Sequence, residues 1–116
     1  MLVKLAVGLF ILGALFGVVM LTAILSEKSP PKFAVLMHGL LVASGLGVVG
    51  YDVYLGHRPT LLLVGLGLLV LAALGGLTLL RCDLSQKPIP RALAMGHPVL
   101  AIIGLGLLVI CFFNNI

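Results

Sequence analysis

The chain has 116 residues, of which 62% are hydrophobic and 9% are charged, and its mean hydropathy is +1.36. These values are typical of a polytopic membrane protein and exclude a water-soluble domain. The net charge of +4 comes from a few cations that border apolar runs, which argues against nucleic acid as a partner and favours the charged loops of a membrane protein.

The first apolar run covers residues 2–25 and carries a single early cation, Lys4. It is longer than the apolar region of a usual signal peptide, so we expect a helix of the mature protein. Three further runs, at about residues 33–55, 60–80 and 92–113, are also long enough to cross a hydrocarbon core of about 30 Å. Short connections make neighbouring spans antiparallel. The sequence therefore predicts an all-α, integral membrane four-helix up-down bundle, with residues 1–116 as a single transmembrane domain.

The connections differ in charge. Five cations flank the first and third connections, and only two lie on the opposite side; the five are Lys28, Lys32, Arg81, Lys87 and Arg91, and the two are Lys4 and Arg58. Because cytoplasmic loops of membrane proteins are enriched in Lys and Arg, we expect loops 26–32 and 81–91 to be cytoplasmic and both termini to lie outside. The expected location is a bacterial inner membrane.

An internal repeat appears when the chain is shifted by 59 residues. The segment Leu25–Lys32 then falls on Leu84–Arg91, and His38 falls on His97. This predicts two tandem two-helix repeats, residues 1–57 and 60–116, with the same topology and a symmetry axis along the membrane normal.

His38 and His97 are the candidate metal ligands. In an up-down bundle the second and fourth helices are diagonal, so equivalent residues face each other across the central axis. Two imidazoles at equal depth suit an axially ligated haem iron, whereas a structural zinc ion usually takes four protein ligands. The sequence thus predicts haem b as the cofactor, bound through both histidines.

Four further residues are candidates for cofactor binding. Gly45 and Gly104 each follow a histidine by seven residues on nearly the same helix face, where they would leave flat space for a porphyrin. Lys32 and Arg91 each precede a histidine by six residues, about 9 Å along the helix, within reach of haem propionates. The alternatives are close helix packing for the glycines and topology or anionic lipid binding for the cations.

The histidines also have alternative roles. A neutral imidazole could instead hydrogen-bond across helices to Ser44, Thr22, Thr78 or a backbone carbonyl, relay protons, or hold another metal. Since ionisable residues inside a bilayer are costly and usually functional, haem ligation remains the leading hypothesis.

Single histidines inside the spans of a small helical bundle resemble those of membrane b-type cytochromes, in the manner of the cytochrome b561 group. The likeness rests on His38 and His97. Such cytochromes use two histidines per haem and often carry two haems, so the resemblance implies one haem in this chain, or two in a homodimer. A second family of similar size, the small multidrug transporters, has a carboxylate in its first helix, but residues 5–25 here contain no Asp or Glu.

Other polar and aromatic residues have simpler expected roles. The aromatic residues at the ends of the second and fourth spans fit an interfacial belt; these residues are Tyr51, Tyr54, Phe112 and Phe113. A quinone site is the alternative role for the two tyrosines. We expect His57 to be solvated and Asp52 to pair with Arg58 or Lys4. Cys82 and Cys111 are predicted at opposite membrane faces, which excludes a disulfide between them.

The sequence carries no phosphate-binding loop, nucleophile triad or Cys-x-x-Cys motif. We therefore do not expect a self-contained hydrolase or transferase. The predicted haem implies an electron carrier or oxidoreductase, with a quinone or a redox protein as partner. The alternative is a cofactor-free small transporter or scaffold subunit with proton-handling histidines.

Overall fold

The computed structural model describes residues 2–114, which form four helices: α1 (Leu2–Leu25), α2 (Lys32–Tyr54), α3 (Thr60–Leu84) and α4 (Arg91–Phe113). All four are long and apolar enough to cross a membrane. The predicted all-helical membrane bundle is confirmed. The largest difference lies at the end of α3, which continues four residues beyond the predicted end at residue 80, so that Arg81 and Asp83 are helical and the third connection is residues 85–90 rather than 81–91.

Each connection ends its helix in the same way. Glu27, Gly56 and Gln86 have positive φ angles of 60°, 107° and 55°. The residue after each of them donates its backbone amide back to the end of the helix. The Lys28 amide donates to the Ala23 carbonyl at 2.8 Å, and the Lys87 amide donates to the Cys82 carbonyl at 2.9 Å. This is the Schellman arrangement, which satisfies the last helical carbonyls. A proline then caps each following helix, because it lacks the amide hydrogen that the first turn leaves unpaired.

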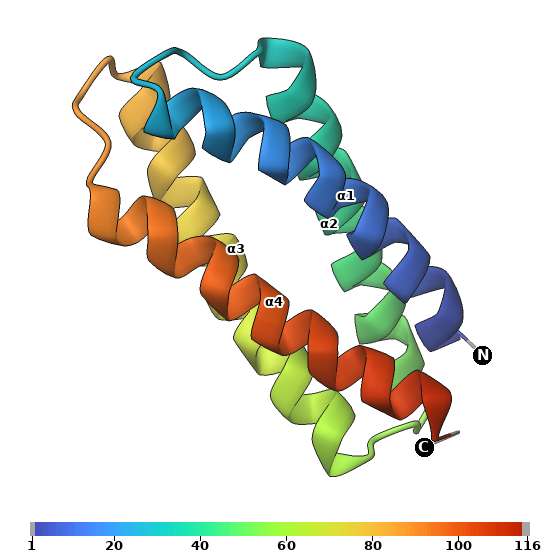
Figure 1. Cartoon of the computed structure of the whole chain (residues 1–116). Helices are drawn as coiled ribbons and strands as arrows, with labels where there is room; N and C mark the ends of the chain where they lie inside the picture. The colour runs from blue at the N-terminus through green and yellow to red at the C-terminus, as the bar shows by residue number, and fades with distance from the viewer. Residues whose placement is uncertain (1, 115–116) are drawn as a thin grey trace.

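The helices form two antiparallel hairpins, α1 with α2 and α3 with α4, that lie side by side (Figure 1). Between the hairpins, α1 contacts α4 and α2 contacts α3, but much more sparsely than within each hairpin. The diagonal pairs are α1 with α3 and α2 with α4. The molecule measures 42 × 24 × 21 Å, which is enough to span a hydrocarbon core of about 30 Å and its interfaces.

The hydrophobic core lies at one end of the bundle. The buried cluster includes Val3, Phe10, Val49, Leu62 and Leu108, which belong to the half that holds both termini and the α2–α3 connection (Figure 1). The opposite half, next to the 26–31 and 85–90 connections, contributes little to this cluster. This division leaves room between the hairpins where the histidines lie.

Candidate functional site

The two histidines make equivalent hydrogen bonds inside their own hairpins. His38 Nδ1 lies 2.8 Å from the Gly13 carbonyl oxygen of α1, and His97 Nδ1 lies 2.6 Å from the Ala72 carbonyl oxygen of α3. Since a carbonyl oxygen only accepts, each Nδ1 carries the proton and donates it. In the neutral form of each imidazole, Nε2 then keeps its lone pair, and this is the form that binds a metal ion. Of the predicted alternatives for hydrogen bonding, the backbone carbonyl is the partner observed.

Two glycines make room for these rings. A Cβ atom added to Gly17 would lie 3.2 Å from His38 Cε1, and one added to Gly76 would lie 3.0 Å from His97 Cε1. Each glycine follows the accepting carbonyl by four residues, one helical turn, and so faces the same side of its helix. The lack of a side chain there allows the imidazole to reach the backbone of the neighbouring helix.

The imidazoles meet between the hairpins. Their ring centroids are 6.2 Å apart and their planes are inclined by 83°. His38 belongs to α2 and His97 to α4, so the two rings come from diagonal helices, as the repeat predicts. Each hairpin thus supplies one imidazole, from opposite sides of the space between them.

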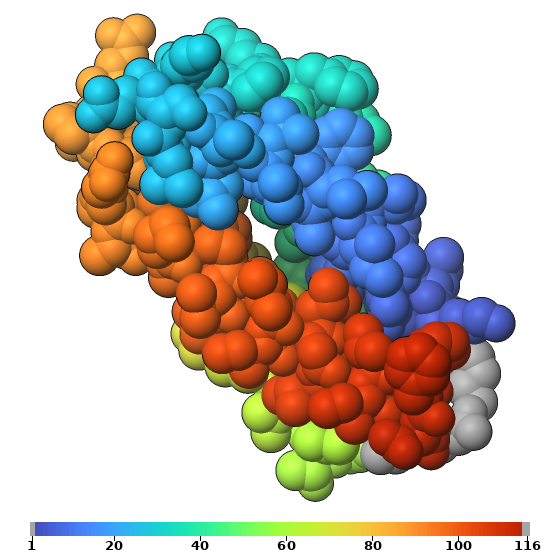
Figure 2. All heavy atoms as spheres, viewed as in Figure 1, coloured from blue at the N-terminus to red at the C-terminus, as the bar shows by residue number. Residues whose placement is uncertain are grey.

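That space is a cavity of about 520 Å³ lined by all four helices, within the range of about 300–1,000 Å³ typical of small-molecule and cofactor sites. Figure 2 shows the surface hollowed between α1 and α4. The shift of 59 residues pairs every lining residue except Ala72. The pairs are Phe10 and Leu69, Ala14 and Ala73, Gly17 and Gly76, Val18 and Leu77, Met20 and Leu79, Leu21 and Leu80, Ile24 and Asp83, Pro30 and Ile89, Val35 and Ala94, His38 and His97, Gly39 and Pro98, Val42 and Ala101, Ala43 and Ile102, and Leu46 and Leu105. The cavity therefore lies on the axis that relates the two repeats.

Gly45 and Gly104 are not part of the cavity lining. A Cβ atom on Gly45 would lie 2.8 Å from the Phe10 ring, and one on Gly104 would lie 2.9 Å from Leu69 Cγ. Phe10 and Leu69, themselves repeat equivalents, both line the cavity at the end that meets the core. Both glycines therefore pack closely against these two side chains, which themselves border the cavity.

The cations lie outside the cavity. Lys32 and Arg91 are exposed first residues of α2 and α4, and no Lys or Arg of residues 2–114 lines it. The charged side chain that does line it is Asp83, which the sequence analysis had placed in a loop. The signal that could have found it is the absence of any Pro or Gly between residues 77 and 87, which lets α3 continue past the apolar run.

The remaining predicted residues lie at the bundle ends. Asp52 pairs with His57, not with Arg58 or Lys4 as predicted, while Arg58 Nε donates to the Val53 carbonyl at 3.1 Å. Within residues 2–114, no group of three or more His, Cys, Asp or Glu could hold a metal ion. Cys82 and Cys111 are free. The Tyr51 and Tyr54 rings are stacked at 6.3 Å, and both are exposed.

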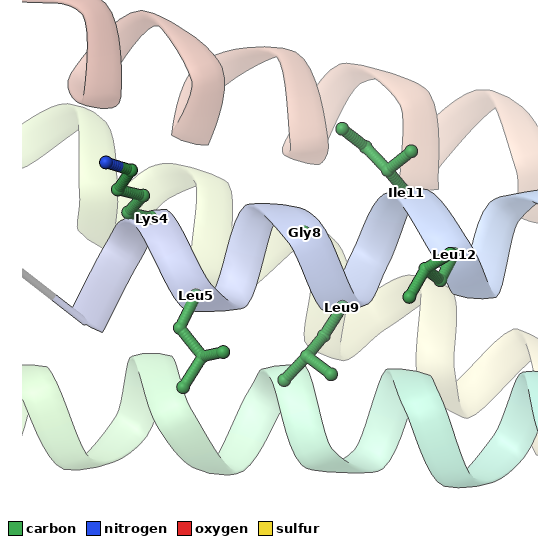
Figure 3. A pocket seen from close by; sticks show the side chains of 6 residues that line it. All are labelled: Lys4, Leu5, Gly8, Leu9, Ile11 and Leu12. Carbon is green, nitrogen blue, oxygen red and sulfur yellow. The ribbon is translucent and has the colours of Figure 1, made fainter.

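A second hollow lies on α1 alone, near the N-terminus (Figure 3). It is shallow and open, and Lys4 is its one charged lining residue. A single flexible cation among leucines offers no convergent polar groups, so this surface gives no basis for a binding site.

The glycines beside the histidines provide a test of the site's geometry. Replacing Gly17 or Gly76 with valine is expected to displace the neighbouring imidazole, because the Cβ atom alone would lie 3.0–3.2 Å from the ring and the two methyl groups of valine need further space. Gly8→Val is the matched control for α1, since nothing lies within 4 Å of its Cβ position. Histidine NMR shifts should change in the first two variants and stay constant in the control; unchanged shifts in Gly76→Val would contradict the contact.

Comparison of the chain with protein-family profiles, with curated proteins and with solved structures finds no match in any of the three.

Proposed function

We propose that the protein binds one haem b between His38 and His97 and carries electrons within the membrane. The observation that carries the proposal is the symmetric pair of imidazoles, each with its Nδ1 proton committed to a backbone carbonyl, facing one apolar cavity. Two imidazoles that ligate one metal ion from opposite sides, with bonds of about 2 Å, have ring centres about 6 Å apart. The observed separation of 6.2 Å fits that requirement.

The shape and lining of the cavity support a flat, apolar ligand. A group lying between the hairpins would have His38 on one face and His97 on the other. Several α1 and α3 residues of the lining are small, among them Gly17, Gly76, Ala14 and Ala73, and the two glycines lie against the histidine rings. Because the lining is paired about an axis, a porphyrin, whose ring is itself nearly symmetric, fits it better than a strongly asymmetric substrate does.

The residues of this chain would hold and insulate the group. The Nε2 atoms of His38 and His97 would hold the group, the carbonyls of Gly13 and Ala72 would fix the ring orientations through Nδ1, and the apolar walls would keep out water. When bound, haem supplies one-electron chemistry. Two protein ligands suffice because a porphyrin provides the others, which a bare zinc ion would have to find among further side chains.

The visible spectrum of the purified protein tests the proposal. In mild detergent, the dithionite-reduced protein should show a sharp low-spin α-band, and pyridine haemochrome should give about one haem per chain. Protein that is colourless and cannot be reconstituted with haem would contradict the proposal. Its partner class would be a membrane quinone or redox protein, and the cation-rich end of the bundle is proposed to face the cytoplasm in a bacterial inner membrane.

A second candidate is a cofactor-free transporter whose histidines handle protons. The observation in its favour is Asp83, which lines the same cavity as the two histidines and could extend a proton pathway to the loop end. This candidate predicts colourless protein and a transport activity whose pH dependence disappears in the histidine variants.

A further inference from the structure

The cavity reaches the outer surface of the bundle between the two hairpins. Val18 on α1 and Ile102 on α4 line the cavity although they are 63% and 69% exposed, and the surface is hollowed between these two helices (Figure 2). Their repeat equivalents, Leu77 on α3 and Ala43 on α2, also line the cavity and are exposed. The cavity thus has one opening between α1 and α4 and an equivalent opening between α2 and α3.

Both openings lie at the depth of the hydrocarbon. Ile102 and Ala43 are the central residues of α4 and α2, and Val18 and Leu77 lie within about 8 Å of the middle of α1 and α3 along the helix axis. The hydrocarbon core of a bilayer extends about 15 Å to each side of its midplane. All four rim residues therefore face lipid chains, and all four are apolar.

The two ends of the cavity are bordered by the chain itself. Phe10 and Leu69, which are buried, line the end that meets the core. At the other end, Pro30 and Ile89 from the two connections line it; Pro30 is buried and Ile89 is half-buried. The exposed residues of the lining all belong to helices and not to the connections; they are Ala14, Val18, Gly39, Ala43, Leu77 and Ile102. The cavity is therefore most open toward lipid.

We propose that the cavity takes its ligand sideways from the hydrocarbon of the membrane, through the openings between the hairpins. The choice of haem as this ligand rests on the proposed function. A largely apolar molecule in the bilayer can pass the apolar rims without entering water, whereas a polar molecule would have to give up its hydration first. Because the hairpins contact each other sparsely, they can separate enough to admit a flat group edge-on. The ligand class is a largely apolar molecule dissolved in the membrane.

Narrowing the rims tests this route. The rim variant carries phenylalanine at all four exposed rim positions, and its matched control carries phenylalanine one residue further along each helix. The rim variant is Val18→Phe, Ala43→Phe, Leu77→Phe and Ile102→Phe; the control is Val19→Phe, Ser44→Phe, Thr78→Phe and Ile103→Phe, at positions that are exposed but do not line the cavity. In vesicles preloaded with haem, the rim variant should take up haem severalfold more slowly than the wild type, and the control at the wild-type rate.

A fluorescent reporter tests the openings without haem. The sequence has no tryptophan, so Phe10→Trp places a single one at a cavity residue that is only 4% exposed. Phosphatidylcholine with brominated chains should quench this tryptophan more than iodide in the water does. Adding the four rim substitutions should reduce the quenching by lipid, and adding the four control substitutions should not. Leu69→Trp, at the repeat equivalent, gives a second reporter if the first variant does not fold.

The outcomes separate this inference from the proposed function. If the rim variant takes up haem at the wild-type rate and its reporter is quenched as in the control, sideways entry is overturned while haem binding stands. Stronger quenching by iodide than by brominated lipid would also overturn it, since the cavity would then be filled from the loop end, past Asp83. If the rim substitutions reduce lipid quenching but no variant binds haem, the openings stand and the proposed function is overturned.

Discussion

Replacing either His38 or His97 with alanine is expected to abolish the low-spin haem spectrum of the purified protein. Each substitution replaces one of the two proposed ligands with an apolar methyl group. The remaining histidine is then the single imidazole that lines the cavity. Among the residues that line the cavity, His38 and His97 are the two imidazoles, so no further imidazole is there to replace the lost ligand. The double variant should be as deficient as either single one, because the two ligands act as a unit.

Loss of haem in these variants is expected without loss of the fold. Each alanine removes one hydrogen bond between helices, from Nδ1 to the Gly13 or Ala72 carbonyl. Such bonds in membrane proteins contribute about 0.6 kcal/mol on average. The accepting carbonyl keeps its bond within its own helix, and the core at the other end of the bundle is untouched. Circular dichroism and gel filtration should therefore match the wild type.

The matched control is His57→Ala, which removes the third histidine of the chain. His57 pairs with Asp52 near the end of α2, on the opposite end of the bundle from the cavity mouth. Its haem content and spectrum should equal those of the wild type. Unchanged haem in both His38→Ala and His97→Ala would remove the basis for axial ligation.

The helices could be predicted because hydropathy and turn residues agree along most of the chain. The one large error, at the end of α3, has a physical cause. Hydropathy detects only the apolar part of a helix, and this helix continues for four residues beyond it, through the charged Arg81 and Asp83. Its actual end is set by the turn at Gln86, where a non-glycine residue adopts a positive φ that no composition rule indicates.

The repeat made the histidine pair predictable, but not what surrounds it. The histidines' partners are backbone carbonyls, which every residue has, so no residue type marks them. Gly45 was predicted beside the porphyrin from its spacing to His38 on one helix. Which side chain fills the space next to a glycine depends on the facing helix, and there Phe10 occupies it. Gly17 lies on the partner helix and contacts the ring instead.

The second large effect is expected from Gly104→Leu, which should destabilise the second hairpin. A Cβ atom at this position would lie 2.9 Å from Leu69 Cγ and 3.1 Å from the Gly65 carbonyl oxygen. Leu69 can change its rotamer, but the Gly65 backbone belongs to α3 and cannot move alone. The two helices must therefore separate, and overpacking of this kind costs about 1–3 kcal/mol, occasionally more. Thermal unfolding in detergent should show a clearly lower midpoint.

Gly106→Leu and Gly45→Leu separate the cost of the added side chain itself from the cost of its contact with the facing helix. Gly106 has nothing within 4 Å of its Cβ position, so leucine there should leave the midpoint unchanged. At Gly45 the close atoms belong to the Phe10 ring alone, 2.8–3.0 Å away, and a ring can swing aside into the cavity. Gly45→Leu should therefore lower the midpoint less than Gly104→Leu, while reducing haem binding because Phe10 then fills part of the cavity. Equal midpoints for Gly104→Leu and Gly106→Leu would show that the close contact between α3 and α4 is not needed for stability.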